Sequence, residues 1–352
     1  MAKIAVIPGD GIANEVVPEA VKVLDVVNEK YELGLEYETF DLGSERYLRT
    51  GEAFPEDLDG FIDDLPNRFD AALFGAGGID HRTPEDVSAM PVLVGLRRRL
   101  DLFANVRPCR LIAPDLTPLK NKTAEDINFT VIRENTEGYE FGTAGNYRVG
   151  TEDEVEIRPE YNTYKGVKRV LEFAFNYAQQ EGSTRVHMAE KGLPDGLWNR
   201  VFAEVSARYP NIEGIHTHVD TLAYMMVVSP EELQVVVGEN RIGDVLSDIG
   251  GAVQGSRGLA PTGCYNPEKN FCYFEPVHGT GPDILGKGVA NPMAAIMASK
   301  MLLEHLAHRE AAGAIESAVR HAISQGQTTP DIGGSLSTTQ VGDAIRARLS
   351  AD

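Results

Sequence analysis

Short apolar segments that end in glycine turns and lead into helical patterns recur along this chain of 352 residues. The first, KIAVIP at residues 3–8, has no polar alternation, and it precedes a helical pattern over residues 14–27. Strands of this kind are typical of a sheet covered on both faces. Further strands are expected at residues 35–40, 70–75, 129–132, 185–189, 215–220 and 233–237. Helices are expected at residues 165–180, 221–228, 293–306 and 312–324. This alternation predicts an α/β fold.

The charge balance argues against two classes of partner. Lys and Arg total 33 against 53 for Asp and Glu, which gives a net charge of -20. A surface this acidic repels phosphate backbones and anionic lipids, so we expect neither nucleic-acid nor membrane binding. The three cysteines, Cys109, Cys264 and Cys272, have no metal-ligand spacing. Because the chain also starts directly with a strand pattern rather than a signal peptide, we expect reduced thiols in a cytoplasmic protein.

An anionic ligand would need a local group of arginines in such an acidic chain. Residues 97–99 are three consecutive arginines, Arg107 follows shortly after, and Arg133 comes directly after the strand expected at residues 129–132. Arginine binds carboxylates with two parallel hydrogen bonds and keeps its charge at any working pH. The sequence therefore predicts an anion pocket, although the second or third arginine of the run could belong to a solvated helix face.

A pair of carboxylates indicates a metal site. Asp244 and Asp248 stand four residues apart, so on a helix both side chains would share one face. Hard oxygen ligands of this kind suit Mg²⁺ or Mn²⁺. The apolar residues Val245, Leu246 and Ile249 would then lie on the buried side. The alternative is an acidic first turn that complements the helix dipole.

Other polar residues come at the ends of expected strands. Asp220 ends the strand expected at residues 215–220 and could cap the next helix or supply a metal ligand. Lys191 could act as a base if it were desolvated, although such lysines are more often exposed. His216 and His218 would share one face of a strand, but a His-x-His pair without a third ligand is weak evidence for zinc.

Three segments have no packing pattern of their own. The loop 275–292 is rich in Gly, Pro and His and suits a bound nucleotide, with an ordinary surface loop as the alternative. The glycine-rich segment 75–80 does not support an ordinary dinucleotide fingerprint, because it lacks the last glycine and Pro84 follows. Residues 142–161 are polar, have no core face and could form an arm that pairs with a second subunit.

Together these motifs resemble the β-decarboxylating hydroxyacid dehydrogenases, the family of the isocitrate, 3-isopropylmalate, homoisocitrate and tartrate/D-malate dehydrogenases. The resemblance runs from IPGDGI at residues 7–12 to TPDIGG at residues 329–334, nearly the whole chain. It is most specific in the Gly/Pro/His loop and in ENRIGDVLSD at residues 239–248. The segment RENTEG at residues 133–138 looks most like the tartrate/D-malate branch, and LRRRLDL at residues 96–102 looks closer to the homoisocitrate branch.

The resemblance implies an isocitrate/isopropylmalate dehydrogenase-like doubly wound fold rather than an ordinary Rossmann fold. It implies a discontinuous cofactor-binding domain made of residues 1–103 and 255–352. Residues 104–254 would form a second domain for substrate, metal and dimer contacts, with an arm near residues 142–161. Because the family site is completed by a second subunit, a homo-oligomer is implied, most simply a dimer.

The resemblance also implies roles for individual residues. The substrate would bind to Arg97, Arg107, Arg133, Leu93 and Val94. The metal, Mg²⁺ or Mn²⁺, would bind to Asp244, Asp248 and Asp220 of the partner subunit. NAD would be held by Ile12, Glu275, His278, Gly279, Thr280, Asp283 and Asn291. The catalytic group would be Lys191 as the base near the substrate hydroxyl, Tyr139 as the acid, and Asp220.

Two departures from the family pattern bear on this chemistry. The family tyrosine comes seven residues after the arginine that matches Arg133, where this chain has Glu140, and Tyr139 stands one residue early. On an extended segment this shift would turn Glu140 into the pocket, whereas a turn after Gly138 could restore Tyr139. We favour Tyr139 at this point, because a phenol beside arginines and a metal is a workable acid. The second departure is that the segment after Lys191 is short and lacks the asparagine that the family places near the nicotinamide.

The predicted function is NAD- and Mg²⁺- or Mn²⁺-dependent oxidative decarboxylation of a small anionic 2-hydroxy diacid, such as 3-isopropylmalate, D-malate, tartrate or homoisocitrate. Leu93 and Val94, one turn before Arg97, indicate an apolar or small group on the third carbon. Asp283 favours NAD, because a carboxylate that accepts the ribose hydroxyls would repel a 2′-phosphate. Two alternatives stay open: a dehydrogenase for a non-standard 2-hydroxy acid from a specialised pathway, and a non-catalytic regulatory subunit of the same family.

Overall fold

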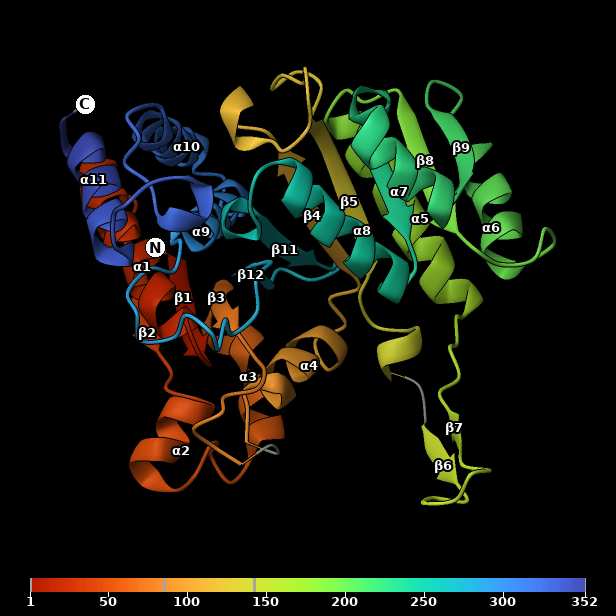
Figure 1. Cartoon of the computed structure of the whole chain (residues 1–352), viewed down its shortest axis with the longest axis horizontal. Helices are drawn as coiled ribbons and strands as arrows, with labels where there is room; N and C mark the ends of the chain where they lie inside the picture. The colour runs from red at the N-terminus through yellow and green to blue at the C-terminus, as the bar shows by residue number, and fades with distance from the viewer. Residues whose placement is uncertain (1, 85–86, 142–143, 352) are drawn as a thin grey trace.

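The computed structural model describes residues 2–84, 87–141 and 144–351. Its core is a ten-stranded sheet with the strand order β2-β1-β3-β12-β11-β4-β5-β10-β8-β9. The strands are β1 (Ala2–Gly9), β2 (Leu35–Thr39), β3 (Ala71–Ala76), β4 (Ala104–Arg110), β5 (Asn128–Glu134), β8 (Arg185–Glu190), β9 (Glu213–His218), β10 (Val235–Gly238), β11 (Pro261–Tyr265) and β12 (Cys272–Pro276). Helices cover both faces of this sheet (Figure 1), so the predicted α/β fold is confirmed.

The helices follow the apolar periodicity of the sequence. They are α1 (Ala13–Lys30), α2 (Ser44–Thr50), α3 (Leu58–Arg68), α4 (Met90–Arg98), α5 (Tyr164–Gln180), α6 (Leu197–Ser206), α7 (Val219–Val228), α8 (Asn240–Val253), α9 (Met293–His305), α10 (Arg309–Ser324) and α11 (Thr338–Ala351). In α1, Val16, Ala20, Val23 and Val27 are fully buried at the expected helical spacing. Within the described part of the chain, none of the helices combines the length and apolar composition that crossing a bilayer requires.

Antiparallel pairing interrupts the otherwise parallel sheet at its centre. Strand β11 is antiparallel to both β12 and β4, and β4 is antiparallel to β5. In the β4–β5 register Asn105 lies opposite Arg133, and Arg107 lies two residues further along β4 on the same face. That face is covered by α8, because a Cβ added to Gly243 would lie 2.7 Å from the Cβ of Arg133. Two of the predicted substrate arginines therefore lie under one helix.

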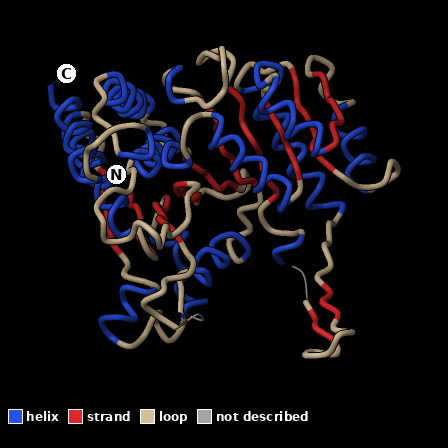
Figure 2. The backbone as a smooth tube through the Cα atoms, in the orientation of Figure 1, coloured by secondary structure: helices blue, strands red, loops and turns tan. Residues whose placement is uncertain are grey.

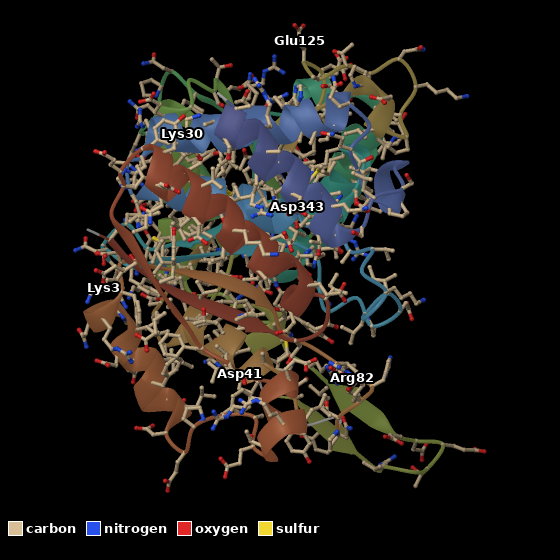
Figure 3. The ribbon with its side chains drawn as sticks, turned by 90° about the vertical axis from the view of Figure 1, so that its left-hand side faces the viewer. Lys3, Lys30, Asp41, Arg82, Glu125 and Asp343 are labelled. Atoms are coloured by element: carbon tan, nitrogen blue, oxygen red, sulfur yellow. The ribbon has the colours of Figure 1, made fainter. Side chains whose placement is uncertain are left out.

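The two ends of the chain build the same half of the molecule. Helices α1 and α11 pack side by side (Figure 3), and Nζ of Lys30 donates to the carbonyl of Leu349 at 2.8 Å. Strands β1 to β3 and helices α9 and α10 lie in this half as well (Figure 1). The arrangement agrees with a discontinuous first domain, and the domain boundaries at residues 103 and 255 remain a prediction.

A hairpin projects from the other half of the molecule (Figures 1 and 2). Its strands, β6 (Gly145–Tyr147) and β7 (Val155–Ile157), pair with each other in antiparallel fashion. Although the sequence looked polar here, the large apolar side chains of Tyr147, Val149, Val155 and Ile157 are 47% to 68% exposed. A lone two-stranded hairpin is marginally stable in water. The predicted arm is thus present from residue 144 onward, residues 142 and 143 lie outside the described part, and pairing of the arm with a second subunit remains a prediction.

The packing of α8 on the sheet can be tested at Gly250. A Cβ at this position would lie 2.2 Å from Sγ of Cys109 on β4. We expect Gly250→Ala to lower the free energy of unfolding by about 1–3 kcal/mol, the usual cost of overpacking, as measured by urea denaturation.

The matched control is Gly313→Ala on α10, where no described heavy atom lies within 4 Å of the added Cβ. This substitution should raise the free energy of unfolding by up to about 1 kcal/mol, because alanine is the better helix former. Equal changes in the two variants would contradict the close contact between α8 and β4.

Candidate active site

Arg97 comes from the last turn of α4 and is buried against β12. Its Nε donates to the hydroxyl of Tyr273 at 2.9 Å, and its Nη2 donates to Oε1 of Glu275 at 3.1 Å. Tyr273 and Glu275 alternate along β12 and therefore share one face. Burial would lower the pKa of Arg97, but Tyr273 and Glu275 outweigh burial and raise it. The guanidinium is consequently fixed in its charged form.

Arg107 and Arg133 converge on the carboxylate of Asp244. Both side chains are at most 6% exposed, and each donates from Nη1 to Oδ1 of Asp244, with a distance of 3.0 Å for Arg107. Arg107 also donates to Oγ of Ser247 at 2.7 Å and to Oδ1 of Asn105 at 3.0 Å. The structure thus brings Arg107, Arg133 and Asp244 together, and their roles toward substrate and metal remain a prediction.

The guanidinium groups of the cluster repel one another, although three carboxylates, those of Asp244, Glu140 and Glu275, balance their charge. Burial lowers the pKa of Arg133, and the charges of Arg107 and Arg97 lower it further. Burial would raise the pKa of Asp244, but Arg133 and Arg107 outweigh burial and lower it. In addition, Nε of Arg133 is buried without a hydrogen-bond partner in the described part of the chain. The unpaired Nε of Arg133 is a donor that an entering anion could use, and a further negative charge would reduce the repulsion between the arginines.

The position that departs from the family pattern lies at this cluster. Nη2 of Arg133 donates to Oε1 of Glu140 at 2.8 Å, and Nη1 of Arg97 lies 3.9 Å from the other carboxylate oxygen. The ring of Tyr139 instead lies 4.6 Å from the guanidinium carbon of Arg241. The expectation that Tyr139 faces the substrate arginines is therefore not met in this structure, because Glu140 occupies that place.

Helix α8 carries two of the predicted metal ligands, Asp244 and Asp248. It starts at Asn240, and the carboxylate of Glu239 caps it by accepting from the backbone N–H groups of Arg241 and Ile242. Asp244 lies beyond the first turn, so the alternative of an acidic first turn is wrong.

The buried side of α8 also differs from the prediction at one position. Leu246 is fully buried and Ile249 is partly buried, but Val245 is 55% exposed. Successive residues of an α-helix are turned by about 100° around its axis. Leu246 points toward the sheet, and Val245, one residue earlier, is therefore turned to the side that faces solvent.

The donor set on α8 fits a hard divalent cation. Oδ1 of Asp244 accepts from the two arginines, while Oδ2 has no hydrogen-bond partner in the described part of the chain. Asp248 has one ionic neighbour, Arg257, at 3.7 Å. One chain therefore offers two carboxylates at i and i+4, which are two of the oxygen ligands that Mg²⁺ or Mn²⁺ prefers.

Lys191 and Asp220 form a separate pair. Nζ of Lys191 donates to Oδ2 of Asp220 at 2.6 Å, and the two side chains are 60% and 65% exposed. Hydrogen bonding to Lys191 lowers the pKa of Asp220. Among the described residues, no hydrogen bond or ion pair joins this pair to the arginine cluster. A single chain thus does not bring the predicted base and third metal ligand to Asp244.

The predicted cofactor residues gather around the loop after β12. The backbone N–H of Ile12 donates to the carbonyl of Thr280 at 2.9 Å, and Asn291 donates to Asp331 at 3.1 Å. Nδ1 of His278 bonds the carbonyl of Gly279 at 2.9 Å, while its Nε2 is buried without a partner in the described chain. An orphaned ring nitrogen is a free hydrogen-bonding group for a base or ribose, so these residues fit a nucleotide.

The other predicted residues are less closely tied to the site. Asp283 is exposed in the same loop. The carboxylate of Glu275 accepts a hydrogen bond from Arg97 and so belongs to the arginine cluster rather than to this loop. Leu93 is buried in an apolar cluster, and Val94 is partly exposed. The sequence interpretation did not anticipate Asn105, Tyr273 and Ser247 as partners of the arginines. Only the alternation of Tyr273 with Glu275 on one strand could have indicated such a role.

A large cavity of about 910 Å³ lies on the opposite face of the sheet, lined by Val106, Pro108 and Lys300 among others. Val106 and Arg107 are adjacent on β4 and so point to opposite faces. Lys300 in this cavity is already paired with Glu304 at 2.8 Å and Glu316 at 3.3 Å. Three buried guanidinium groups converge at the arginine cluster, which is therefore the better candidate site.

Comparison with known proteins decides the family. A family model described as isocitrate/isopropylmalate dehydrogenase matches residues 3–345. The chain belongs to the isocitrate/isopropylmalate dehydrogenase family. The predicted resemblance and the predicted dehydrogenase class are thereby confirmed.

Three relatives with different printed activities are almost equally similar to the chain. The 3-isopropylmalate dehydrogenase of Thermobifida fusca (strain YX) is 40% identical over 99% of this chain and 98% of its own length. The tartrate dehydrogenase/decarboxylase of Pseudomonas putida is 39% identical over 99% and 98%. The D-malate dehydrogenase (decarboxylating) of Escherichia coli (strain K12) is 39% identical over 97% of both chains. Identity therefore does not distinguish between these substrates.

Solved structures support the same fold. The isocitrate dehydrogenase from Methylococcus capsulatus superposes with a TM-score of 0.87 at 32% identity over 99% of each chain. An apo β-decarboxylating dehydrogenase from Thermococcus kodakarensis gives a TM-score of 0.78 at 32% identity over 100% of this chain and 97% of that one. The predicted isocitrate/isopropylmalate dehydrogenase-like fold is confirmed.

Asp244→Asn tests the charge balance of the cluster. The substitution removes the negative charge that two buried guanidinium groups share, so it should lower the free energy of unfolding near neutral pH. Because the pKa of Asp244 is lower in the folded protein than in the unfolded chain, its stabilisation is fully present above the ordinary value of about 3.9 and is lost as the pH falls through the folded value.

The difference in unfolding free energy between wild type and variant should therefore shrink below about pH 4, as measured by urea denaturation across pH. A difference that stays constant down to about pH 2 would contradict the ionic contribution of Asp244.

Proposed function

We propose that this chain converts a small 2-hydroxy diacid to a 2-oxo acid, CO₂ and NADH, using NAD and Mg²⁺ or Mn²⁺. The observation that carries the proposal is the convergence of Arg97, Arg107 and Arg133 around Glu140 and Asp244, within a chain of this dehydrogenase family. Buried, converging arginines suit the carboxylates of a diacid. The adjacent helix carboxylate suits a divalent cation.

The residues of the chain would divide the chemistry between them. The three arginines would hold the substrate carboxylates and thereby orient the hydroxyl-bearing carbon toward the cofactor loop. When bound, the metal would polarise the substrate hydroxyl and the neighbouring carboxylate as a Lewis acid, and NAD would accept the hydride. Lys191 of the partner subunit would take the hydroxyl proton. Loss of CO₂ would leave a carbanion equivalent that must regain one proton.

The proposed assembly is a homodimer in which Lys191 and Asp220 of each chain complete the active site of the other chain. In support, the two side chains are exposed and separate from the arginine cluster of their own chain. Apolar side chains are also exposed on the adjoining helices, with Tyr224 at 65% and Val228 at 49% on α7 and Val245 at 55% on α8. Together with the exposed apolar hairpin, they supply a surface that a second copy would cover.

The substrate is proposed to carry two carboxylates rather than three, because Glu140 already uses part of the positive charge. A partly exposed Val94 leaves room for a small or apolar group on the third carbon.

A non-standard 2-hydroxy acid is the second candidate, favoured by Glu140 in the arginine cluster and by the missing asparagine after Lys191. A non-catalytic regulatory subunit is disfavoured because the arginine and aspartate set is intact. With all three cysteines free, we also propose a cytoplasmic location.

The direct test is a screen of 2-hydroxy diacids with NAD and Mn²⁺, in which NADH and CO₂ are measured separately. We expect turnover with at least one diacid, a preference for NAD over NADP, and loss of turnover in Asp244→Asn. Asp343→Asn on the exposed face of α11 (Figure 3) is the matched control and should retain full rates. Full activity of Asp244→Asn, or full activity in excess chelator, would rule out the metal role. Tight diacid binding without any NADH would favour the regulatory alternative.

Variants at the displaced tyrosine test which side chain acts at the substrate. Glu140 pairs with Arg133 where a substrate carboxylate would bind, so Glu140→Gln should lower KM for the diacid by up to about tenfold. Tyr139→Phe should leave both NADH and CO₂ formation near wild-type rates, since its ring lies against Arg241. A large loss of either rate in Tyr139→Phe would restore the tyrosine to the catalytic role. CO₂ loss uncoupled from NADH formation in Glu140→Gln would instead make the glutamate the acid.

A further inference from the structure

Glu190, His216 and His218 gather at the carboxyl ends of β8 and β9, outside the arginine cluster. Their potential ligand atoms, one from each residue, all lie within 4.8 Å of one another. In the β8–β9 register Glu190 lies opposite His218, and His216 lies two residues earlier on the same face of β9. The predicted His-x-His pair therefore does meet a third residue of metal-ligating type, which comes from the neighbouring strand.

The carboxylate of Glu190 is held in place by the surrounding structure. It is buried, its Oε1 lies 2.9 Å from Nε2 of His216, and its Oε2 accepts from the backbone N–H of Gly192. Nδ2 of Asn199 lies 3.3 Å from Oε1. The contacts from Gly192 and Asn199 are of the kind that orient the ligands of metal centres, whereas a bound ion would replace the hydrogen bond between Glu190 and His216.

The two imidazoles are positioned to receive an ion from solvent. Their ring centroids are 5.2 Å apart in an edge-to-face arrangement, and both residues are exposed. Among the described residues, the ring nitrogens of His218 have no hydrogen-bond partner. Zinc ligands lie about 2.0–2.2 Å from the ion and so roughly 3.3–3.5 Å from one another. Rotation of the two side chains, which are both exposed, would supply the remaining approach.

We propose that Glu190, His216 and His218 form a binding site for a borderline transition-metal dication, of which Zn²⁺, Co²⁺ and Ni²⁺ are examples. Two imidazoles and one carboxylate suit these ions, whereas Mg²⁺ and Mn²⁺ prefer oxygen ligands. A water molecule would complete the coordination, since the site is open to solvent. The site is separate from the carboxylates of α8 and does not depend on the proposed dehydrogenase function.

The location gives the site a consequence for catalysis. Lys191 directly follows Glu190, and Asp220 stands two residues after His218. A metal bound to Glu190 and the two histidines would link the ends of β8 and β9. Lys191 and Asp220, which form the exposed ion pair, come directly after these strand ends. Occupancy would therefore restrict the movement of the residues that are proposed to enter the neighbouring subunit.

The test uses Co²⁺ as the probe, because its visible absorption reports coordination. The full-length Asp244→Asn protein is first stripped with chelator, so that the helix carboxylates cannot account for binding. Co²⁺ is then titrated without substrate or NAD and followed by absorption and calorimetry. We expect one equivalent per chain and binding at least about tenfold weaker after a further His216→Ala or His218→Ala substitution. The matched control is His321→Ala on the exposed surface of α10, which should bind as the parent does.

Each outcome decides the proposal. Absence of stoichiometric Co²⁺ binding in the Asp244→Asn protein would overturn it and leave the Glu190–His216 contact as a hydrogen bond that orients the loop after β8. Binding that persists in both histidine variants would also overturn it. His218 is exposed and makes no hydrogen bond within the described chain, so His218→Ala should fold even if His216→Ala does not. Since no turnover is measured, failure of the dehydrogenase proposal would not affect the result.

Discussion

Three buried guanidinium groups, and the three carboxylates paired with them, constrain the architecture of this protein. Arg133 is 2% exposed at the end of β5, under α8. An uncompensated buried charge costs several kcal/mol, so the fold must bring anions to it. Asp244 from α8 and Glu140 from the turn after β5 form ion pairs with Arg133. Glu275 from β12 forms an ion pair with Arg97. The positions of α8, β12 and the segment after Gly138 are thereby coupled to one another.

These charges lie where the sheet changes direction at its centre. The antiparallel strands β4 and β11 join the two parallel halves, and β4 presents Asn105 and Arg107 beside Arg133 of β5. On the other side, β12 presents Tyr273 and Glu275 to Arg97. Both halves contribute charges that an incoming anion and a metal would redistribute. The internal carboxylates stabilise the substrate-free protein but compete with the ligands it is proposed to bind.

The sequence was most informative where the physical signal is local. The uninterrupted apolar run of β1 predicted a doubly covered strand, and the spacing of Asp244 and Asp248 placed them on one helix. The sequence left open whether Asp244 lies in the first turn of α8, because a side-chain cap such as that of Glu239 is easily taken for part of the preceding loop. The contact of Arg97 with Tyr273 spans 176 residues of sequence and has no local signature.

The displaced tyrosine shows why local reasoning could not settle the site. An extended segment was expected to turn Glu140 inward by alternation, and a turn was expected to restore Tyr139. The segment Tyr139–Phe141 is in fact a 3₁₀ turn that follows Gly138 at φ +84°. With three residues per turn, neighbouring side chains diverge by about 120°, so one of the pair had to leave the arginines. Arg133 attracts the carboxylate of Glu140 more strongly than the phenol of Tyr139. The guanidinium of Arg241 instead lies over the ring of Tyr139 in a cation–π contact. The charge of the arginines, rather than the local backbone, therefore selects which side chain faces the site.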